Sequence, residues 1–345
     1  MRRRGKSRSP IGLDVGRRRV KAVQFHRAGG RWRVAAAASV PRVDNGAEID
    51  PAEVRDLKSR LAEMGFHGAR VVLAVPSDRL ITGIVELPPV DSGAPIERLA
   101  RSELARMHKC DPGSLEMAYW ELPAPARAGN ATFVMGVACT HEDANRFLDA
   151  FETEGFDVER LDVQAGAIAR VCRPLLRDVR GTAGILDIGW SAARLILMHG
   201  ETVAYERNLT RSGLAALVLA RGAEPAPTEE QVDQLLGPAE RQAAGPADGR
   251  IGPEARRQYV EGLIDEMRIP LSYLASQYPD SPLERLLLVG GGGRLPGLAK
   301  ALGPALGCEV RVAGPGELAA CPEEIAADHG AELMTALGLA QPDEG

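Results

Sequence analysis

The sequence predicts an α/β protein made of two mixed-sheet domains that are related by duplication. Two apolar hairpin sequences repeat about half a chain apart, and a later segment combines a strand, a run of glycines and a helix. The chain has 345 residues, of which 45% are hydrophobic and 26% are charged. This is enough material for the cores of two or three domains of a soluble globular protein.

The repeat consists of two stretches, IGLDVGRRRVKAVQF and GILDIGWSAARLILM, which align on Asp14 and Asp187. Each stretch has a glycine two positions after the aspartate and a basic residue, Lys21 or Arg194, seven positions after it. The offset of 173 residues is about half of the chain. A repeat at this distance indicates duplicated domains and not a solenoid of short units.

Each stretch predicts a strand, a tight turn and a second strand. The glycine lets the backbone approach an anion closely, and successive N–H groups in such a turn form an anion-binding nest. The aspartate repels a phosphate, but it can hold Mg²⁺ or the waters around it. One such hairpin alone would be read as an ordinary Asp-Gly turn. Two at matching positions favour a clamp around one metal–triphosphate.

The third segment, LERLLLVGGGGRLPGLAKAL over residues 283–302, predicts a buried strand, a glycine turn and a helix that begins near Leu295 or Pro296. A strand, a glycine turn and a helix N-terminus together make an edge that can contact a nucleotide. The segment is not a Walker A loop, because no Gly-Lys-Ser/Thr follows. It also lacks the GxGxxG spacing.

The composition excludes several classes of protein. No run of about 18 apolar residues is present, so we expect no membrane-spanning helix. The basic start is not followed by the apolar region of a signal peptide. The five cysteines form no CxxC pair, and the six histidines have no metal-ligand spacing. We therefore expect reduced thiols in a cytosolic protein and no zinc site.

Charge is distributed unevenly along the chain. The first 33 residues carry a net charge of +11, whereas the whole chain carries −5, so the remainder carries −16. A basic arm on an acidic body suits a polyanionic neighbour, such as lipid headgroups, a nucleotide or an acidic protein face. An inert, solvated tail over residues 2–8 is the alternative that the sequence leaves open.

Taken together, the two Asp-x-Gly hairpins and the strand–GGGG–helix segment resemble the ATPase fold of actin, heat-shock proteins and sugar kinases. Over nearly its full length the chain resembles PilM, the cytoplasmic actin-like protein of type IV pilus assembly. IGLDVGRRRVKAVQF resembles the first phosphate loop of that family, RSELARMHKCDPGSLEMAYWEL its insert, and VMGVACTHEDANRFLDAFETEGFDVERLDVQAGAIARV the return to the first domain. LIDEMRIPLSYL resembles the helix beside the adenosine, and LLLVGGGGRLPGL resembles the adenosine loop.

The resemblance implies a domain organisation. A first actin-like domain would span residues 1–180 and carry an FtsA/PilM-type inserted subdomain at about 82–158. A second actin-like domain would span residues 181–345, with a helical subdomain at about 206–282.

Within this organisation, apolar spacing predicts helices near 95–108 and 141–154 in the insert and strands near 116–122 and 131–139. The Pro-, Gly- and Ala-rich region 221–254 predicts a short helix among loops.

The same resemblance assigns candidate site residues by position. Asp14 and Asp187 would hold Mg²⁺, and Gln164 would position an attacking water, which makes these three the candidate catalytic residues. ATP would be contacted from both turns, from one helix and from the glycine run. The implied ATP-binding residues are Gly16, Arg17, Arg18, Lys21, Gly189, Ser191, Glu266, Arg268, Gly290, Gly291, Gly292 and Gly293.

Three departures from the family pattern surround this site. Arg17, Arg18 and Arg19 stand where serines are common, Trp190 is bulky where small residues are usual, and Pro270 interrupts a helix. Guanidinium groups bind phosphate well, so the arginines either contact the nucleotide or fill its space. Side chains alternate along an extended tip, so at most two of the three arginines can point inward. We therefore expect nucleotide binding more than efficient hydrolysis.

The resemblance implies a cytoplasmic scaffold, peripheral at the inner membrane, in a type IV pilus or related secretion machine. Its partner would be the N-terminal cytoplasmic tail of a bitopic, PilN-like inner-membrane protein. An extended peptide would lie in a groove between the inserted subdomain and its host. Other components of the machine would be further partners, and we expect no nucleic acid.

Other proteins of the same fold are the alternatives. A sugar or small-metabolite kinase needs a carboxylate base aimed at a substrate hydroxyl, and no sugar-binding motif is recognisable. An FtsA-like division protein would need a basic amphipathic helix at its C-terminus, whereas this chain ends in AELMTALGLAQPDEG. A GspL secretion protein would carry a spanning helix after this domain, and a heat-shock protein would carry a peptide-binding domain.

Overall fold

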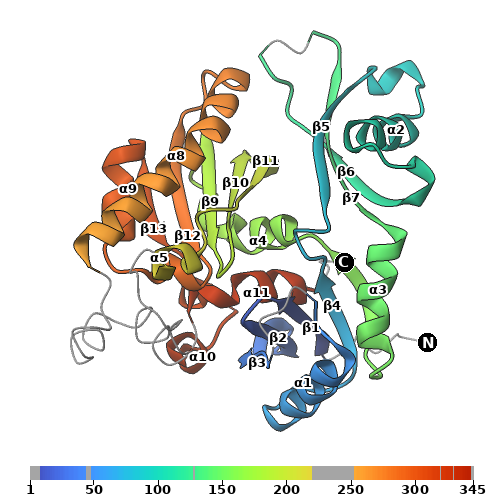
Figure 1. Cartoon of the computed structure of the whole chain (residues 1–345), viewed down its shortest axis with the longest axis vertical. Helices are drawn as coiled ribbons and strands as arrows, with labels where there is room; N and C mark the ends of the chain where they lie inside the picture. Colours follow the sequence, from blue (N-terminus) through green and yellow to red (C-terminus); the bar gives the residue numbers. More distant parts are fainter. Residues whose placement is uncertain are drawn as a thin grey trace.

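The computed structural model describes most of the chain as two five-stranded sheets, one three-stranded sheet and the helices around them (Figure 1). The described residues are 8–43, 48–126, 129–219, 252–318, 320–328 and 330–342. The start of the expected basic tail, up to residue 7, lies outside them, as does nearly all of the loop region expected at 221–254. None of the helices within these ranges has both the length and the apolar character that crossing a membrane requires.

The sheets are named here by their strands. The first sheet contains β1 (Arg8–Val15), β2 (Arg19–Ala28), β3 (Arg31–Pro41), β4 (Arg70–Ala74) and β8 (Asp157–Asp162). The second sheet contains β9 (Thr182–Ile188), β10 (Ala193–His199), β11 (Thr202–Leu209), β12 (Leu283–Val289) and β13 (Glu309–Val312). The small sheet contains β5 (Ile81–Leu87), β6 (Leu115–Glu121) and β7 (Thr132–Thr140).

The described α-helices are distributed over the whole chain. They are α1 (Pro51–Glu63), α2 (Ile96–His108), α3 (His141–Glu152), α4 (Gln164–Cys172), α5 (Leu214–Leu219), α8 (Pro253–Gln277), α9 (Leu298–Leu306), α10 (Glu323–Asp328) and α11 (Met334–Ala340).

The two large sheets share one topology. Their strand orders are β3-β2-β1-β4-β8 and β11-β10-β9-β12-β13, and in each the first three strands are antiparallel and the last two run parallel. The aspartate of each repeat therefore lies at the end of the central strand of its sheet. The predicted fold class, an α/β protein with duplicated mixed sheets, is confirmed. The division of the chain between residues 180 and 181 stays a prediction.

Helices α4 and α11 lie between the two large sheets (Figure 1). Val23 of β2, Ile196 of β10 and Ile168 of α4 belong to one buried cluster, so the sheets share a core. The helices approach unusually closely, because a Cβ on Gly338 of α11 would lie 2.0 Å from the carbonyl oxygen of Ala167 in α4. This shared core holds the ends of β1 and β9 in a fixed relation.

The small sheet stands beside the first sheet and also touches the second. Its β6–β7 hairpin reaches β11, where Trp120 Nε1 donates a hydrogen bond to the Val203 carbonyl at 2.8 Å. Near the end of α8, Tyr278 Oη donates to the Pro123 carbonyl at 2.8 Å. Helix α2 covers the small sheet with Leu104, which is fully buried. The predicted strands and helices of this region are observed within two residues of the expected bounds.

One local expectation for the second half is wrong. The helix after the glycine run begins at Leu298 and not near 295, because Gly297 has a left-handed backbone (φ 83°) and a 3-10 turn, Gly291–Arg294, comes first. Helix α8 continues through Pro270, which is buried. Leu263 and Met267 of this helix are fully buried in the core of the second domain.

Candidate functional site

The two Asp-x-Gly turns have matching geometry. In the cross-strand register, Asp14 lies opposite Lys21, and Asp187 lies opposite Arg194. Each glycine N–H closes its own turn: Gly16 donates to the Arg19 carbonyl at 3.1 Å, and Gly189 donates to the Ala192 carbonyl at 3.0 Å. The glycine N–H groups are thus engaged within the turns, and their predicted contact with phosphate stays a prediction.

A chain of polar contacts joins the two hairpins through the first residue of α4. Lys21 Nζ lies 3.2 Å from Asp14 Oδ2, and Gln164 Nε2 donates to Asp14 Oδ1 at 3.0 Å. On its other side, the Gln164 Oε1 atom accepts a hydrogen bond from Arg194. The amide of Gln164 is therefore engaged at both ends, and it links the first sheet to the second.

Arg194 also faces a buried carboxylate. Its Nη1 atom lies 3.7 Å from Oε2 of Glu206, and both side chains are more than nine-tenths buried. Burial raises the pKa of Glu206, an effect that the positive charge of Arg194 partly offsets. The contact is an ion pair without a hydrogen bond, since Glu206 Oε2 and Arg194 Nε have no hydrogen-bond partner among the described residues.

Asp187 lies against the glycine run. A Cβ on Gly290 would lie 2.2 Å from Asp187 Oδ1, so that only a glycine fits there. Burial and then the charge of Asp14 raise the pKa of Asp187 to about 6. The repulsion shows that the two carboxylates act on each other across the hairpins.

That Asp14 and Asp187 hold Mg²⁺ stays a prediction. Two opposed carboxylates gain from a dication between them, and Mg²⁺ typically takes one or two carboxylates together with waters and phosphate oxygens. Among the residues that the structure describes, no group of three or more His, Cys, Asp or Glu side chains is arranged to hold a metal. A cation at Asp14 and Asp187 would thus need further ligands from waters or from a nucleotide.

The three arginines of the first turn point to different partners. Arg17 reaches Asp78 at 3.3 Å, and Arg19 donates to the Ser39 hydroxyl on β3 at 2.8 Å. The guanidinium of Arg18 lies over the indole of Trp190, 4.4 Å from the ring centroid. Two of the departures noted in the sequence, Arg18 and Trp190, therefore contact each other across the two hairpins.

The α8 residues expected beside the nucleoside have structural partners. Glu266 accepts hydrogen bonds from the Ser212 hydroxyl and from the N–H of Arg211 at 3.2 Å, which fixes the loop before α5. Arg268 is exposed and pairs with Asp265 at 3.3 Å. The structure thus directs the carboxylate of Glu266 on α8 to that loop and leaves Arg268 exposed on the same helix, and their contacts with a nucleoside stay predictions.

The glycine run packs against the second turn, as a nucleotide edge would require. A Cβ on Gly292 would overlap the side chain of Ile188 at 2.3 Å, and Gly290 N–H donates to the Ala331 carbonyl at 3.0 Å. Gly291 and Gly293 flank Gly292 in the 3-10 turn, and Ser191 is exposed at the tip of the second turn.

Sequence reasoning missed the role of Arg194, although the repeat had already aligned it with Lys21. It also treated Arg18 and Trp190 as separate departures. Their contact had no signal in the sequence, because it depends on how the two sheets face each other.

Two sheets of one topology, an Asp-x-Gly hairpin in each and a glycine run against the second aspartate define a protein of the actin-like ATPase fold. A family model described as "Type IV pilus assembly protein PilM" matches residues 12–216, and the chain belongs to this family.

Solved structures agree with this assignment. The chain is similar to the structure titled "PilM-PilN type IV pilus biogenesis complex", with 25% identity and a TM-score of 0.77 over 97% of this chain and 99% of that one. It also matches the ethanolamine utilization protein EutJ from Carboxydothermus hydrogenoformans, with 16% identity and a TM-score of 0.55 over 97% and 90% of the two chains. The second likeness shows the fold alone.

Proposed function

We propose that this protein is a scaffold of a type IV pilus or related secretion machine that binds the cytoplasmic tail of a PilN-like inner-membrane protein. The observation that carries the proposal is the match to the PilM-PilN complex over nearly the whole of both chains. The protein would act in the cytoplasm, peripheral at the inner membrane, with its position set by the partner.

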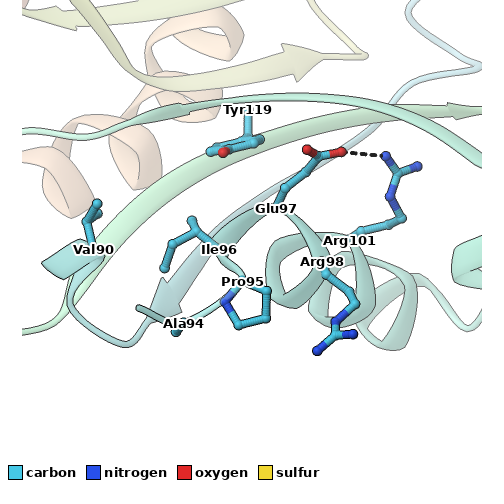
Figure 2. A pocket seen from close by; sticks show the side chains of 8 residues that line it. All are labelled: Val90, Ala94, Pro95, Ile96, Glu97, Arg98, Arg101 and Tyr119. Atoms are coloured by element: carbon cyan, nitrogen blue, oxygen red, sulfur yellow. Dashed lines mark hydrogen bonds and ion pairs between the residues drawn. The ribbon is translucent and has the colours of Figure 1, made fainter. Parts of the chain in front are cut away.

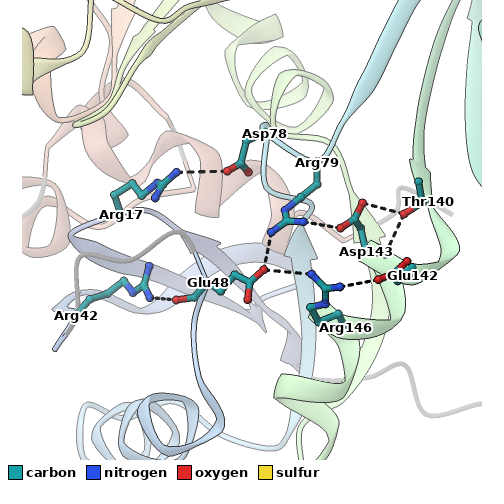
Figure 3. Close-up of polar contacts among 9 residues, drawn as sticks. All are labelled: Arg17, Arg42, Glu48, Asp78, Arg79, Thr140, Glu142, Asp143 and Arg146. Carbon is teal, nitrogen blue, oxygen red and sulfur yellow. Dashed lines mark hydrogen bonds and ion pairs between the residues drawn. The ribbon is translucent and has the colours of Figure 1, made fainter. Parts of the chain in front are cut away.

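The tail would bind near the small sheet. Segment 75–80 leads from the first sheet to the small one, and α3 leads back. Arg79 in this segment donates a hydrogen bond to Asp143 of α3 at 2.7 Å and also contacts Glu48 (Figure 3). An extended peptide laid along this junction would contact both sheets, which suits the groove predicted between the insert and its host.

A second candidate surface is a shallow groove of about 530 Å³ at the start of α2 (Figure 2). It is lined by Val90, Ala94, Pro95, Ile96, Glu97, Arg98, Arg101 and Tyr119. This groove lies within the insert itself and not at the junction, so one experiment can separate the two surfaces.

That experiment is a titration of the full-length protein with a fluorescent peptide from the cytoplasmic tail of a PilN-like protein of the same organism. We expect saturable binding that Arg79→Ala weakens and Tyr119→Ala leaves unchanged. Weaker binding by Tyr119→Ala, with Arg79→Ala unchanged, would indicate that the tail binds in the α2 groove. No binding of any tail peptide would refute the proposed partner.

We also propose that the paired hairpins bind MgATP with little turnover. Asp14 and Asp187 would hold the cation, and Lys21 would bind phosphate. The cation would neutralise the phosphate charge. Poor turnover is supported by Gln164, because its Nε2 donates to Asp14 and its Oε1 accepts from Arg194, so that protein groups at both ends hold the amide that would orient the attacking water.

Calorimetry with MgATP tests the nucleotide site. We expect binding by the wild type and none by Asp14→Asn, with phosphate release close to background in the wild type and in Gln164→Ala. Robust hydrolysis that disappears in Gln164→Ala would overturn the bridging role of Gln164. If neither the wild type nor any variant binds MgATP, the protein is a scaffold that works without a nucleotide.

A further inference from the structure

We propose that Arg18 and Trp190 form a latch between the two large sheets that regulates the proposed nucleotide site. The contact spans the first turn and the second turn, at 4.4 Å from the guanidinium carbon to the ring centroid. This lies well inside the distance of about 6 Å at which a cation is attracted to an indole face. The regulatory part of the proposal rests on the nucleotide site proposed above.

Both sides of the latch stand on a fixed backbone. The carbonyl of Arg18 accepts a hydrogen bond from the N–H of Arg42 at 2.8 Å, and Arg42 also donates to the Gly16 carbonyl at 3.2 Å. The carbonyl of Trp190 accepts from the N–H of Ala215 at 2.9 Å, at the start of α5. The backbones of both turns are therefore held in place, and only the two side chains have to be ordered when the contact forms.

The neighbouring arginines take other partners, which leaves Arg18 in the bridging position. Arg17 is directed to Asp78, and Arg19 is held by Ser39 on β3 (Figure 3 shows Arg17). Gln164, at the start of α4, is a second link between the sheets at this site. The latch thus connects the two turns, and Gln164 connects Asp14 with Arg194 in the strands next to those turns.

The latch and a bound phosphate would compete for one cation. A guanidinium makes stronger, charge-assisted hydrogen bonds to phosphate than to an indole face, so a nucleotide can draw Arg18 away from Trp190. The nucleotide must first offset the latch, which lowers its apparent affinity. A contact of this kind shifts the equilibrium by about twofold to tenfold.

The test is a double-mutant cycle with Arg18→Ser, Trp190→Leu and the double variant of the full-length protein. Leucine keeps the apolar packing of Trp190 but has no aromatic face. In denaturant unfolding without nucleotide, we expect the effects of the two substitutions to be non-additive. The matched control is a cycle of Arg17→Ser with Trp190→Leu, which should be additive because Arg17 does not touch the indole.

The regulatory part is tested by MgATP calorimetry on the same variants. We expect Trp190→Leu to tighten binding by about twofold to tenfold, and to have no such effect in the Arg18→Ser background. Additive effects in both assays would refute the latch. Coupling in unfolding with no nucleotide binding in any variant would refute the nucleotide site and the regulatory role, and would leave the latch as a structural bridge only.

Discussion

The close approach of Gly290 to Asp187 gives a sharp prediction for Gly290→Ala. Gly290 has φ 77° and ψ 174°, a conformation open essentially to glycine alone, and another residue there costs about 1–3 kcal/mol. The added Cβ would also lie 2.2 Å from Asp187 Oδ1 and 2.7 Å from the Ile188 carbonyl oxygen. Overpacking of this kind costs about 1–3 kcal/mol more, because backbone atoms cannot move aside as a flexible side chain does.

Gly297→Ala is the matched control. Gly297 also has a positive φ of 83°, but a Cβ there would meet no atom within 4 Å. We expect Gly297→Ala to lower the free energy of unfolding only by the cost of placing alanine in a left-handed conformation, about 1–2 kcal/mol. Both variants introduce alanine. They differ in the φ/ψ region of the substituted residue and in whether the new Cβ meets other atoms.

Equilibrium unfolding in urea measures the comparison. We expect Gly290→Ala to lower the free energy of unfolding by about 2 kcal/mol more than Gly297→Ala does. It should also abolish nucleotide binding, since Asp187 has to move. Equal losses of stability in the two variants would show that the packing of the glycine run against Asp187 is not as described.

Three further predictions concern the contacts around the site. Arg42→Ala should lower the free energy of unfolding by about 3–5 kcal/mol, because the carboxylate of Glu53, now paired with Arg42 at 3.0 Å, would stay buried without a counter-charge and would keep the hydrogen bond from the N–H of Val43; a loss below about 1 kcal/mol would contradict this. Trp120→Phe removes the hydrogen bond between the small and second sheets and should cost about 1 kcal/mol in the same assay, with faster amide exchange in the β6–β7 hairpin. Hydrogen bonds from Arg285 hold the pKa of Asp178 down at about 2, compared with an ordinary value of 3.8, so the pair adds stability above pH 3.8 that is lost as the pH falls towards 2. In a carboxyl titration by NMR, Arg285→Ala should return that pKa towards 3.8, and an unchanged value would show that the contact is not formed.

Much of the fold could be predicted from the sequence because its strongest signals are local. The two hairpins repeat an apolar pattern around Asp14 and Asp187, and the periodic spacing in α2 and α3 gives their bounds within two residues. The predicted start of α9 was wrong by two or three residues, since a glycine with a positive φ can delay a helix and the sequence does not report φ.

The candidate site was predictable only in part. Position in the repeat identified both aspartates, but it could not show that Gln164 binds Asp14 and Arg194 at once. Nor could it show that Arg18 meets Trp190. Each of these contacts joins residues far apart in the chain, and each depends on the angle between two sheets. That angle is set by the packing of α4 and α11, which no local pattern encodes.

The close packing of α11 between the sheets has a consequence for the order in which the chain acquires its structure. A Cβ on Gly12 of β1 would lie 2.3 Å from the carbonyl oxygen of Ala336 in α11, so a strand near the start of the chain is covered by a helix near residue 340. During synthesis the first sheet emerges long before this cover exists. The ribosome must release almost the whole chain before β1 is enclosed, and until then its apolar face is open to chaperones or to other nascent chains. Contacts of such long sequence separation also slow folding.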